Sequence, residues 1–252
     1  DWFSVKVEGN MNSYNVSYEQ KDLGDGYAND GGYYELKHEK DLSQTGKIIG
    51  NITKQLNDDF STNIMFGGEH WKQEKSYSRV RTDGGLIVPG RFFIDNSKKT
   101  ILGEGKVNGT KQINSLYFLA NFGWREQLFL DITGRNDWSS ALVYSDGTGN
   151  YSYFYPSVSA SWLFNETLNT PDWLSFGKLR LSWAQVGNDT APYFLNPGYT
   201  IGNYELANGS FVYNNSKSTT SVDRDIKPEK KNSLEVGMDL RLFNNRLGFD
   251  LA

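Results

Sequence analysis

Hydrophobic and polar residues alternate with a period of two along most of the chain. The stretch LFLDITGR, residues 128–135, shows the pattern clearly. Successive side chains of a β-strand point to opposite faces, so the stretch predicts a strand with one apolar and one polar face. The apolar face would carry Leu128, Leu130 and Ile132, and the polar face would carry Asp131, Thr133 and Arg135.

The same alternation recurs in about ten segments, whereas a helical period of 3.6 is hard to find. The clearest segment is NSLEVGMDLRLF, residues 232–243. One face would carry Leu234, Val236, Met238, Leu240 and Leu242, and the other Ser233, Glu235, Gly237, Asp239 and Arg241. Asn244 and Asn245 follow, and because Asn tolerates a positive φ they predict a two-residue hairpin turn. We therefore expect an all-β, antiparallel protein.

Short and long connections separate the strand candidates. Residues 114–124 form a strand candidate that a short turn at 125–127 joins to the strand at 128–135. Further strands are predicted at residues 156–164 and 177–185. By contrast, residues 187–227 contain little pattern and predict a long loop. Alternation of tight turns with long loops is typical of outer-membrane barrels, and a loop of this length is uncommon in a compact soluble domain.

The two faces leave two architectures open. A soluble β-sandwich would present its polar face to open water, usually with many long charged residues. Here that face is rich in Ser, Gly, Asn, Asp and Arg. Aromatic residues near strand ends could lie at two membrane interfaces; these are Trp124, Trp138, Tyr151, Tyr153, Tyr155 and Trp173. The pattern favours a barrel slightly over a sandwich.

Composition narrows the function classes. The 252 residues carry a formal net charge of -4 with both signs interspersed, which leaves no basic patch for nucleic acid. There are no cysteines, so disulfides and thiolate sites are excluded. A mean hydropathy of -0.60 and the lack of long apolar runs exclude helical membrane spans. A transmembrane β-barrel stays possible, because every second residue can face water.

Several segments together resemble the SusC/RagA-type TonB-dependent transporters of the Gram-negative outer membrane. They are GLIVPGRFFIDNS, ITGRNDWSS, YFYPSVSASWLF, LRLSWAQVGND and IKPEKKNSLEVGMDLRLFNNRLGFDL, in an order and spacing that also resemble the family. The resemblance implies a barrel of about 22 strands around a plug. The roughly ten strands predicted here would then make up less than half of such a barrel. Residues 1–252 are expected to belong to the barrel domain, with the plug domain absent from this chain.

The resemblance also implies a function and partners. The intact protein would import oligosaccharides or peptides across the outer membrane, as a multi-pass barrel in contact with outer-membrane lipid. A SusD-like surface lipoprotein would cover it, and the TonB system would act through a missing N-terminal part. Transport by the 252 residues alone is not expected.

Two sets of candidate site residues follow. On the barrel interpretation, the lumen-facing set is Asp131, Thr133, Arg135, Glu235, Asp239 and Arg241. Flat rings stack on sugars, so the ligand-binding candidates are the long-loop aromatics Tyr193, Phe194, Tyr199, Tyr204, Phe211 and Tyr213. These rings could instead pack within the loop or against the partner lipoprotein.

Catalysis and metal binding are not expected. The only two histidines, His38 and His70, have no serine, carboxylate or second histidine at catalytic or ligand spacing in the sequence. The acidic Gly-rich stretches do not fit an EF-hand, and no cofactor motif occurs. Two alternatives stay open: a soluble all-β glycan-binding or adhesive module, and a β-rich glycoside hydrolase, which would need a carboxylate pair.

Overall fold

The computed structural model describes residues 2–24, 29–206, 208–217, 222–223 and 225–252. Within these residues the chain forms eleven strands and only very short helical segments. The strands are β1 Phe3–Asp22, β2 Tyr33–Gln55, β3 Phe60–Arg81, β4 Leu102–Trp124, β5 Leu128–Ser139, β6 Ser152–Leu163, β7 Leu174–Asn188, β8 Tyr199–Glu205, β9 Phe211–Lys217, β10 Glu229–Leu242 and β11 Leu247–Leu251. The helical segments are η1 Ile94–Asn96, η2 Ser140–Leu142 and α1 Phe164–Thr167.

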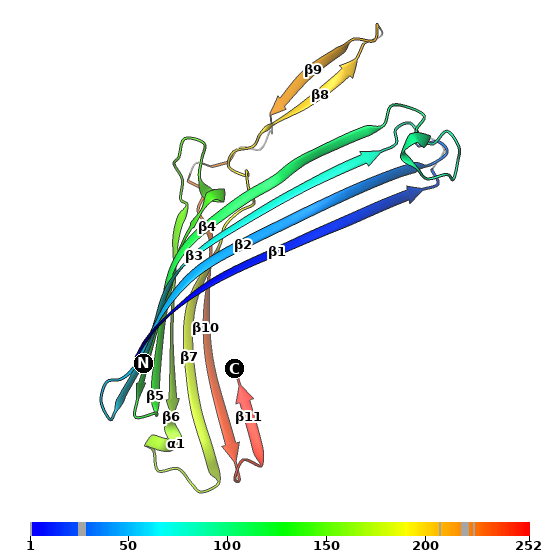
Figure 1. Cartoon of the computed structure of the whole chain (residues 1–252). Coiled ribbons are helices and arrows are strands. Elements are labelled where there is room, and N and C mark those ends of the chain that lie inside the picture. The colour runs from blue at the N-terminus through cyan, green and yellow to red at the C-terminus, as the bar shows by residue number, and fades with distance from the viewer. Residues whose placement is uncertain (1, 25–28, 207, 218–221, 224) are drawn as a thin grey trace. The chain divides into compact units, whose positions relative to one another are not determined.

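Nine of the described strands form one sheet, in the order β1-β2-β3-β4-β5-β6-β7-β10-β11. Each strand therefore lies beside its neighbour in the chain, except where β10 follows β7 (Figure 1). In the main sheet, the strand pairs β4–β5, β5–β6, β6–β7, β7–β10 and β10–β11 are all antiparallel. The prediction of an all-β, antiparallel sheet is confirmed.

The short turn between β4 and β5 is confirmed. β4 ends at Trp124 and β5 begins at Leu128. Arg125 and Glu126 have φ values of 50° and 57°, and the Gln127 amide donates to the Trp124 carbonyl at 2.9 Å. Positive φ at two central residues matches the twist of paired strands, as in a tight hairpin.

The predicted two-residue turn after β10 is wrong in length. β10 ends at Leu242 and β11 begins at Leu247, so four residues connect them. Phe243 has a positive φ of 54°, as Asn244 and Asn245 also do, and the Arg246 amide donates to the Leu242 carbonyl at 3.0 Å. The paired asparagines correctly marked left-handed backbone, but Phe243 adopts it too, which residue type did not predict.

The unpatterned loop predicted at 187–227 is also wrong. β7 continues to Asn188, and β8 and β9 form an antiparallel hairpin that makes its own two-stranded sheet (Figure 1). Its turn contains Gly209 at a φ of 78°, and the Ser210 amide donates to Asn208 Oδ1 at 3.0 Å. Asn-Gly is a strong hairpin signal, but the flanking alternation is too mixed to show the strands.

The chain divides into two compact units, and strands β1 to β4 contribute residues to both. Unit 1 comprises residues 1–8, 46–70 and 113–252, and unit 2 comprises residues 9–45 and 71–112.

In unit 2, residues 85–97, one of the segments that resemble the SusC/RagA family, form a hydrogen-bonded loop whose Leu86 side chain is fully buried. The buried Asn96 side chain accepts from the Val88 amide at 2.9 Å and donates to the carbonyls of Val88 and Arg91.

Rings from neighbouring positions cover several strand glycines. A Cβ on Gly134 of β5 would lie 2.5 Å from the Phe118 ring and 2.7 Å from the Phe154 ring. Phe118 lies on β4 directly opposite Gly134. The ring of Phe66 covers Gly50 in the same way. Such pairs fix the register of strands, because a ring fits only where its neighbour has no side chain.

The sheet has little interior. Among the described residues, Leu86 and Leu142 are the apolar side chains that are almost fully buried, and many large apolar side chains are exposed. No helix among the described residues has the length and apolarity needed to cross a membrane.

Candidate functional site

One face of unit 1 is apolar across the strands from β4 to β11. Cross-strand register places Leu130 beside both Phe122 and Ala160 on this face. It also places Leu181 opposite both Ala160 and Val236. The apolar face consists of Leu116, Phe118, Phe122, Leu128, Leu130, Ile132, Val158, Ala160, Leu179, Leu181, Trp183, Leu234, Val236, Phe249 and Leu251. Most of these side chains are exposed, with Leu234 at 71%.

The opposite face carries a polar cluster that centres on Arg135. Arg135 Nη2 donates to Glu69 Oε1 at 3.0 Å and to Ser115 Oγ at 2.7 Å, while Arg135 Nε donates to Asp137 Oδ1 at 2.7 Å. Lys47 Nζ lies 2.9 Å from Glu69 Oε2. This polar cluster, Lys47, Glu69, Ser115, Arg135 and Asp137, joins β2, β3, β4 and β5.

The polar cluster is largely shielded from solvent. The side chains of Glu69 and Asp137 are 13% and 11% exposed, whereas that of Arg135 is 37% exposed. The Arg135 guanidinium also lies 5.8 Å from the centre of the Tyr117 ring. A planar guanidinium can satisfy several acceptors at once, so each carboxylate has a charge-assisted partner.

Asp131 and Thr133 precede Arg135 on β5 and lie on the same polar face, as the alternation of polar and apolar residues predicted. Asp131 accepts from the Asn121 side chain of β4 and from Ser159 Oγ of β6 at 3.1 Å. Thr133 and Ser157 share a hydroxyl hydrogen bond of 2.5 Å. The structure therefore brings these two residues and Arg135 together on one face.

Glu235, Asp239 and Arg241 share the corresponding face of β10 but do not join the polar cluster. Glu235 lies opposite Ser182 and is exposed, and Asp239 lies opposite Lys178. The Arg241 guanidinium lies 5.3 Å from the centre of the Phe176 ring. These three residues thus form a separate polar stretch on β7 and β10.

Sequence reasoning missed a polar link that crosses β10. Arg180 of β7 donates to Asp250 of β11, two strands away. Gly237 of β10 makes room, since a Cβ there would lie 3.2 Å from Arg180 Nε. The sequence signal was Gly237 itself, a glycine within a regular strand, which often marks a close approach.

Four of the six loop aromatics have described side chains, and these four lie on two segments, the stretch after β7 and the β8–β9 hairpin. Tyr193 and Phe194 follow β7 and are exposed. Tyr199 and Tyr213 lie on the hairpin at 68% and 70% exposure. Their register places them on one side of the hairpin, with the exposed Ile201. The side chains of Tyr204 and Phe211 lie outside the described part of the chain.

Tyr153 and Tyr155, two of the strand-end aromatics, lie on the same face as the polar cluster. They lie opposite Asp137 and Arg135, which places them on the polar face. Tyr153 is buried with Leu142 and Leu195, where the β5–β6 connection packs against the segment after β7. Side chains alternate between the two faces along β6, and this alternation places Tyr153 and Tyr155 on the polar face.

Two turns at one end of the strands are tied together. The Arg125 amide donates to the Asp59 carbonyl at 2.7 Å, and Arg125 Nε donates to Asp59 Oδ1 at 2.8 Å. This side-chain hydrogen bond lowers the pKa of Asp59 below its usual value. The tie joins the β2–β3 turn to the β4–β5 turn.

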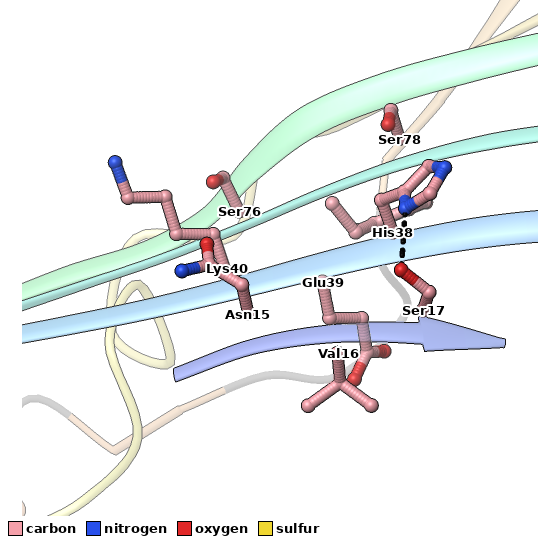
Figure 2. Close-up of a pocket in the computed structure, with 9 residues that line it drawn as sticks. Asn15, Val16, Ser17, His38, Glu39, Lys40, Ser76 and Ser78 are labelled. Atoms are coloured by element: carbon pink, nitrogen blue, oxygen red, sulfur yellow. Dashed lines mark hydrogen bonds between the residues drawn. The ribbon is translucent and has the colours of Figure 1, made fainter. Parts of the chain in front are cut away.

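In unit 2 the structure pairs a histidine with a serine that is distant in sequence. Ser17 Oγ of β1 lies 3.0 Å from His38 Nδ1 of β2, in a polar hollow of about 300 Å³ (Figure 2). Glu39 points away from the pair in Figure 2 and forms an ion pair with Lys37. Within the described residues no carboxylate orients His38, so the pair lacks the third member of a catalytic triad.

His70 has a different partner, the side chain of Asn114, at 2.7 Å from His70 Nδ1. Over the described part of the chain, no group of three or more His, Cys, Asp or Glu residues could hold a metal ion.

Comparison with solved structures shows the fold. The chain matches the structure of the RagAB peptide transporter with a TM-score of 0.77 and 19% sequence identity, over 98% of this chain and 27% of that chain. It matches the RagAB peptide importer in its "closed-closed" state with a TM-score of 0.76 and 19% identity, over the same shares. The predicted fold, a partial antiparallel β-barrel, is therefore confirmed.

Comparison with protein sequences shows the family. TonB-dependent receptor P3 of Formosa agariphila (strain DSM 15362 / KCTC 12365 / LMG 23005 / KMM 3901 / M-2Alg 35-1) is 23% identical over 214 residues, which cover 78% of this chain and 20% of that protein. The chain thus spans about a fifth of this relative's length. A family model described as "TonB dependent receptor-like, beta-barrel" matches residues 1–252. The resemblance to SusC/RagA-type receptors is confirmed, and the chain belongs to the TonB-dependent receptor-like β-barrel family.

Proposed function

We propose that residues 1–252 form part of the barrel wall of an outer-membrane TonB-dependent importer. The observation that carries the proposal is the division of unit 1 into an exposed apolar face and a hydrogen-bonded polar face. A closed barrel satisfies its backbone groups internally, so its apolar face can meet lipid while its polar face lines a wet lumen. A soluble protein would have to cover such an apolar surface.

The lumen assignment applies to both predicted stretches of the polar face. Asp131, Thr133 and Arg135 would line the wall through the polar cluster and its neighbours, and Glu235, Asp239 and Arg241 would line it through β10. Paired charges suit a wall of this kind, because a charged group that keeps its partners stays ordered beside water.

The cargo that we propose is an oligosaccharide or a peptide. A SusD-like surface lipoprotein would cover the barrel, and the TonB system would act through a part of the receptor outside this chain. The exposed rings of Tyr193, Tyr199 and Tyr213 support a binding role, since aromatic side chains bury apolar area at low entropic cost. RagAB, whose structure this chain resembles, is named as a peptide transporter, and this supports a peptide as one candidate cargo.

The barrel itself can be tested on the receptor that contains this chain. The outer-membrane fraction is extracted in detergent, and gel migration is compared before and after boiling. We expect a heat-dependent shift, because a closed ring of strand pairs resists cold detergent. A receptor that is soluble in plain buffer and absent from the outer membrane would contradict the proposal and favour a secreted glycan-binding module.

The cargo requires a second experiment. A deletion strain is supplied with oligosaccharides or peptides as its sole nutrient, and uptake is compared with the parent strain. We expect slower uptake of one class, restored by the wild-type receptor. Uptake of every oligomer at the parental rate would contradict an import function.

A further inference from the structure

A groove lies on the apolar face of unit 1, across the first four strands. It has a volume of about 360 Å³. Its lining includes Val5 of β1, Ile48 and Gly50 of β2, Phe66 and Gly68 of β3, and Leu116 of β4. We call this set the acyl groove.

Two glycines shape the acyl groove, because Gly50 lets the Phe66 ring lie against the sheet and Gly68 leaves space beside it. The Phe66 ring lies over Gly50, where a Cβ would be only 2.5 Å from the ring. Gly68 has more space, since the nearest atom to an added Cβ would be Leu116 Cδ2 at 3.5 Å. A side chain at residue 68 would therefore fill space that is empty in the structure.

The lining of the acyl groove is exposed and apolar. Val5, Ile48 and Leu116 are 56%, 57% and 60% exposed. Leu116 also belongs to the apolar face, so the groove is continuous with the surface that we assign to lipid. The atoms that line a concave apolar surface lack van der Waals contacts on the open side unless an apolar chain fills the hollow. A lipid tail is the apolar chain that a bilayer supplies.

A polar pair lies at one end of the acyl groove. His70 and Asn114 are exposed. His70 lies two residues after Gly68 on β3, and Asn114 lies two residues before Leu116 on β4, so each is on the same side as its neighbour. Two residues of a strand span about 7 Å. The surface thus changes from apolar to polar within the distance that separates an acyl chain from its headgroup.

We propose that the acyl groove binds one acyl chain of a phospholipid whose phosphate lies beside His70. When both ring nitrogens carry a proton, the imidazolium donates through Nδ1 to Asn114 Oδ1 and through Nε2 to a phosphate oxygen. The chain gains contacts on several sides, whereas a lipid against the flat part of the apolar face gains them on one. This inference rests on the proposed membrane location of the apolar face.

The test uses the intact receptor, reconstituted in vesicles with a phospholipid that carries a photoactivatable diazirine in its acyl chain. After illumination, the labelled residues are identified by mass spectrometry. We expect labelling to concentrate at Ile48, Phe66 and Leu116. Labelling spread evenly over the apolar face would overturn the proposal.

Variants make the test specific. Gly68→Leu fills the groove, and we expect its labelling there to fall by about fivefold to tenfold, equivalent to roughly 1 to 1.4 kcal/mol of binding. Ala160→Leu adds the same kind of side chain to the apolar face outside the groove and should leave groove labelling unchanged. Leu116→Trp is a second filling variant, for use if Gly68→Leu lowers the folded yield. Equal labelling in wild type and both filling variants would overturn the proposal.

The headgroup contact has its own variant. His70→Ala should weaken groove labelling by a labelled phospholipid but not by a labelled diacylglycerol, which has no phosphate. The same loss with both lipids would exclude the phosphate contact. Gel migration before and after boiling is recorded for every variant, so that a receptor without a barrel, which contradicts the proposed function, is distinguished from a barrel without a lipid site.

Discussion

Among single residues, Arg135 connects three polar side chains of the polar face, those of Glu69, Ser115 and Asp137. Arg135→Met would leave Glu69 and Asp137, both largely shielded, with fewer partners. Removal of one partner from a buried ion pair is strongly destabilising, and since Arg135 is partly exposed we expect a loss of about 2 kcal/mol in the free energy of unfolding. Urea unfolding of the intact receptor in detergent measures this loss.

Arg135→Lys is the matched variant for charge. Lysine keeps the positive charge but cannot form the two-sided contact of a guanidinium. We expect a loss between those of wild type and Arg135→Met. Equal stability of all three proteins would show that the polar cluster does not hold the strands together.

The Asp59–Arg125 tie predicts a pH dependence. The hydrogen bond from Arg125 lowers the pKa of Asp59 in the folded protein, so its stabilisation is present above the unfolded pKa of about 3.9 and is lost as pH falls through the lower folded pKa. Asp59→Asn should therefore lower the temperature of the gel shift slightly at pH 7. The difference from wild type should vanish in acid below the folded pKa, and a difference that persisted there would contradict a role for the Asp59 charge.

Among elements, the pairing of β4, β5 and β6 depends on Gly134. A methyl group there would meet the rings of Phe118 and Phe154 on the two neighbouring strands. We expect Gly134→Ala to reduce the free energy of unfolding by about 1–3 kcal/mol, the usual effect of overpacking. Urea unfolding measures it. Gly248→Ala in β11 is the control, because nothing lies within 4 Å of its added Cβ, and it should be neutral or slightly stabilising.

The β8–β9 hairpin should be separable from barrel stability. It forms its own two-stranded sheet and exposes Tyr199, Ile201 and Tyr213. Replacement of residues 199–217 by a flexible Gly-Ser linker should leave the temperature of the gel shift unchanged. On the proposed function, it should reduce the amount of lipoprotein that copurifies. A large fall in the shift temperature would show that the hairpin supports the barrel.

For the whole molecule, the sequence predicted what depends on period-two alternation. The two faces of β5 follow from Leu130 and Asp131 being neighbours, and the same holds for Val236 and Glu235 in β10. Long-range contacts carry no local signal. Glu69 and Arg135 are 66 residues apart, so their ion pair could not be read from either segment.

Local chemistry also had limits as a guide to the fold. The left-handed φ of Phe243 is imposed by a turn that must connect Leu242 to Leu247, because Phe has no intrinsic preference for it. Ser17 meets His38 only because β1 and β2 pair. Residues 85–97 were recognisable in the sequence as a segment that resembles the family. The hydrogen bonds between the Asn96 side chain and the Val88 backbone were not, because every residue has a backbone amide and carbonyl.

The edges of the sheet determine what the 252 residues can do alone. Within the described residues, β1 and β11 each have one neighbour in the nine-stranded sheet. Unpaired backbone groups are costly in hydrocarbon, and an exposed edge is a template for association with other chains. We therefore expect the isolated 252-residue chain, refolded in detergent, to show no heat-dependent gel shift and to elute as heterogeneous oligomers in size-exclusion chromatography. The intact receptor, treated identically, should shift on boiling and elute as one species. A monomeric isolated chain with a heat-dependent shift would mean that these strands close on themselves, and the polar cluster would then line a small barrel too narrow for an oligomeric cargo.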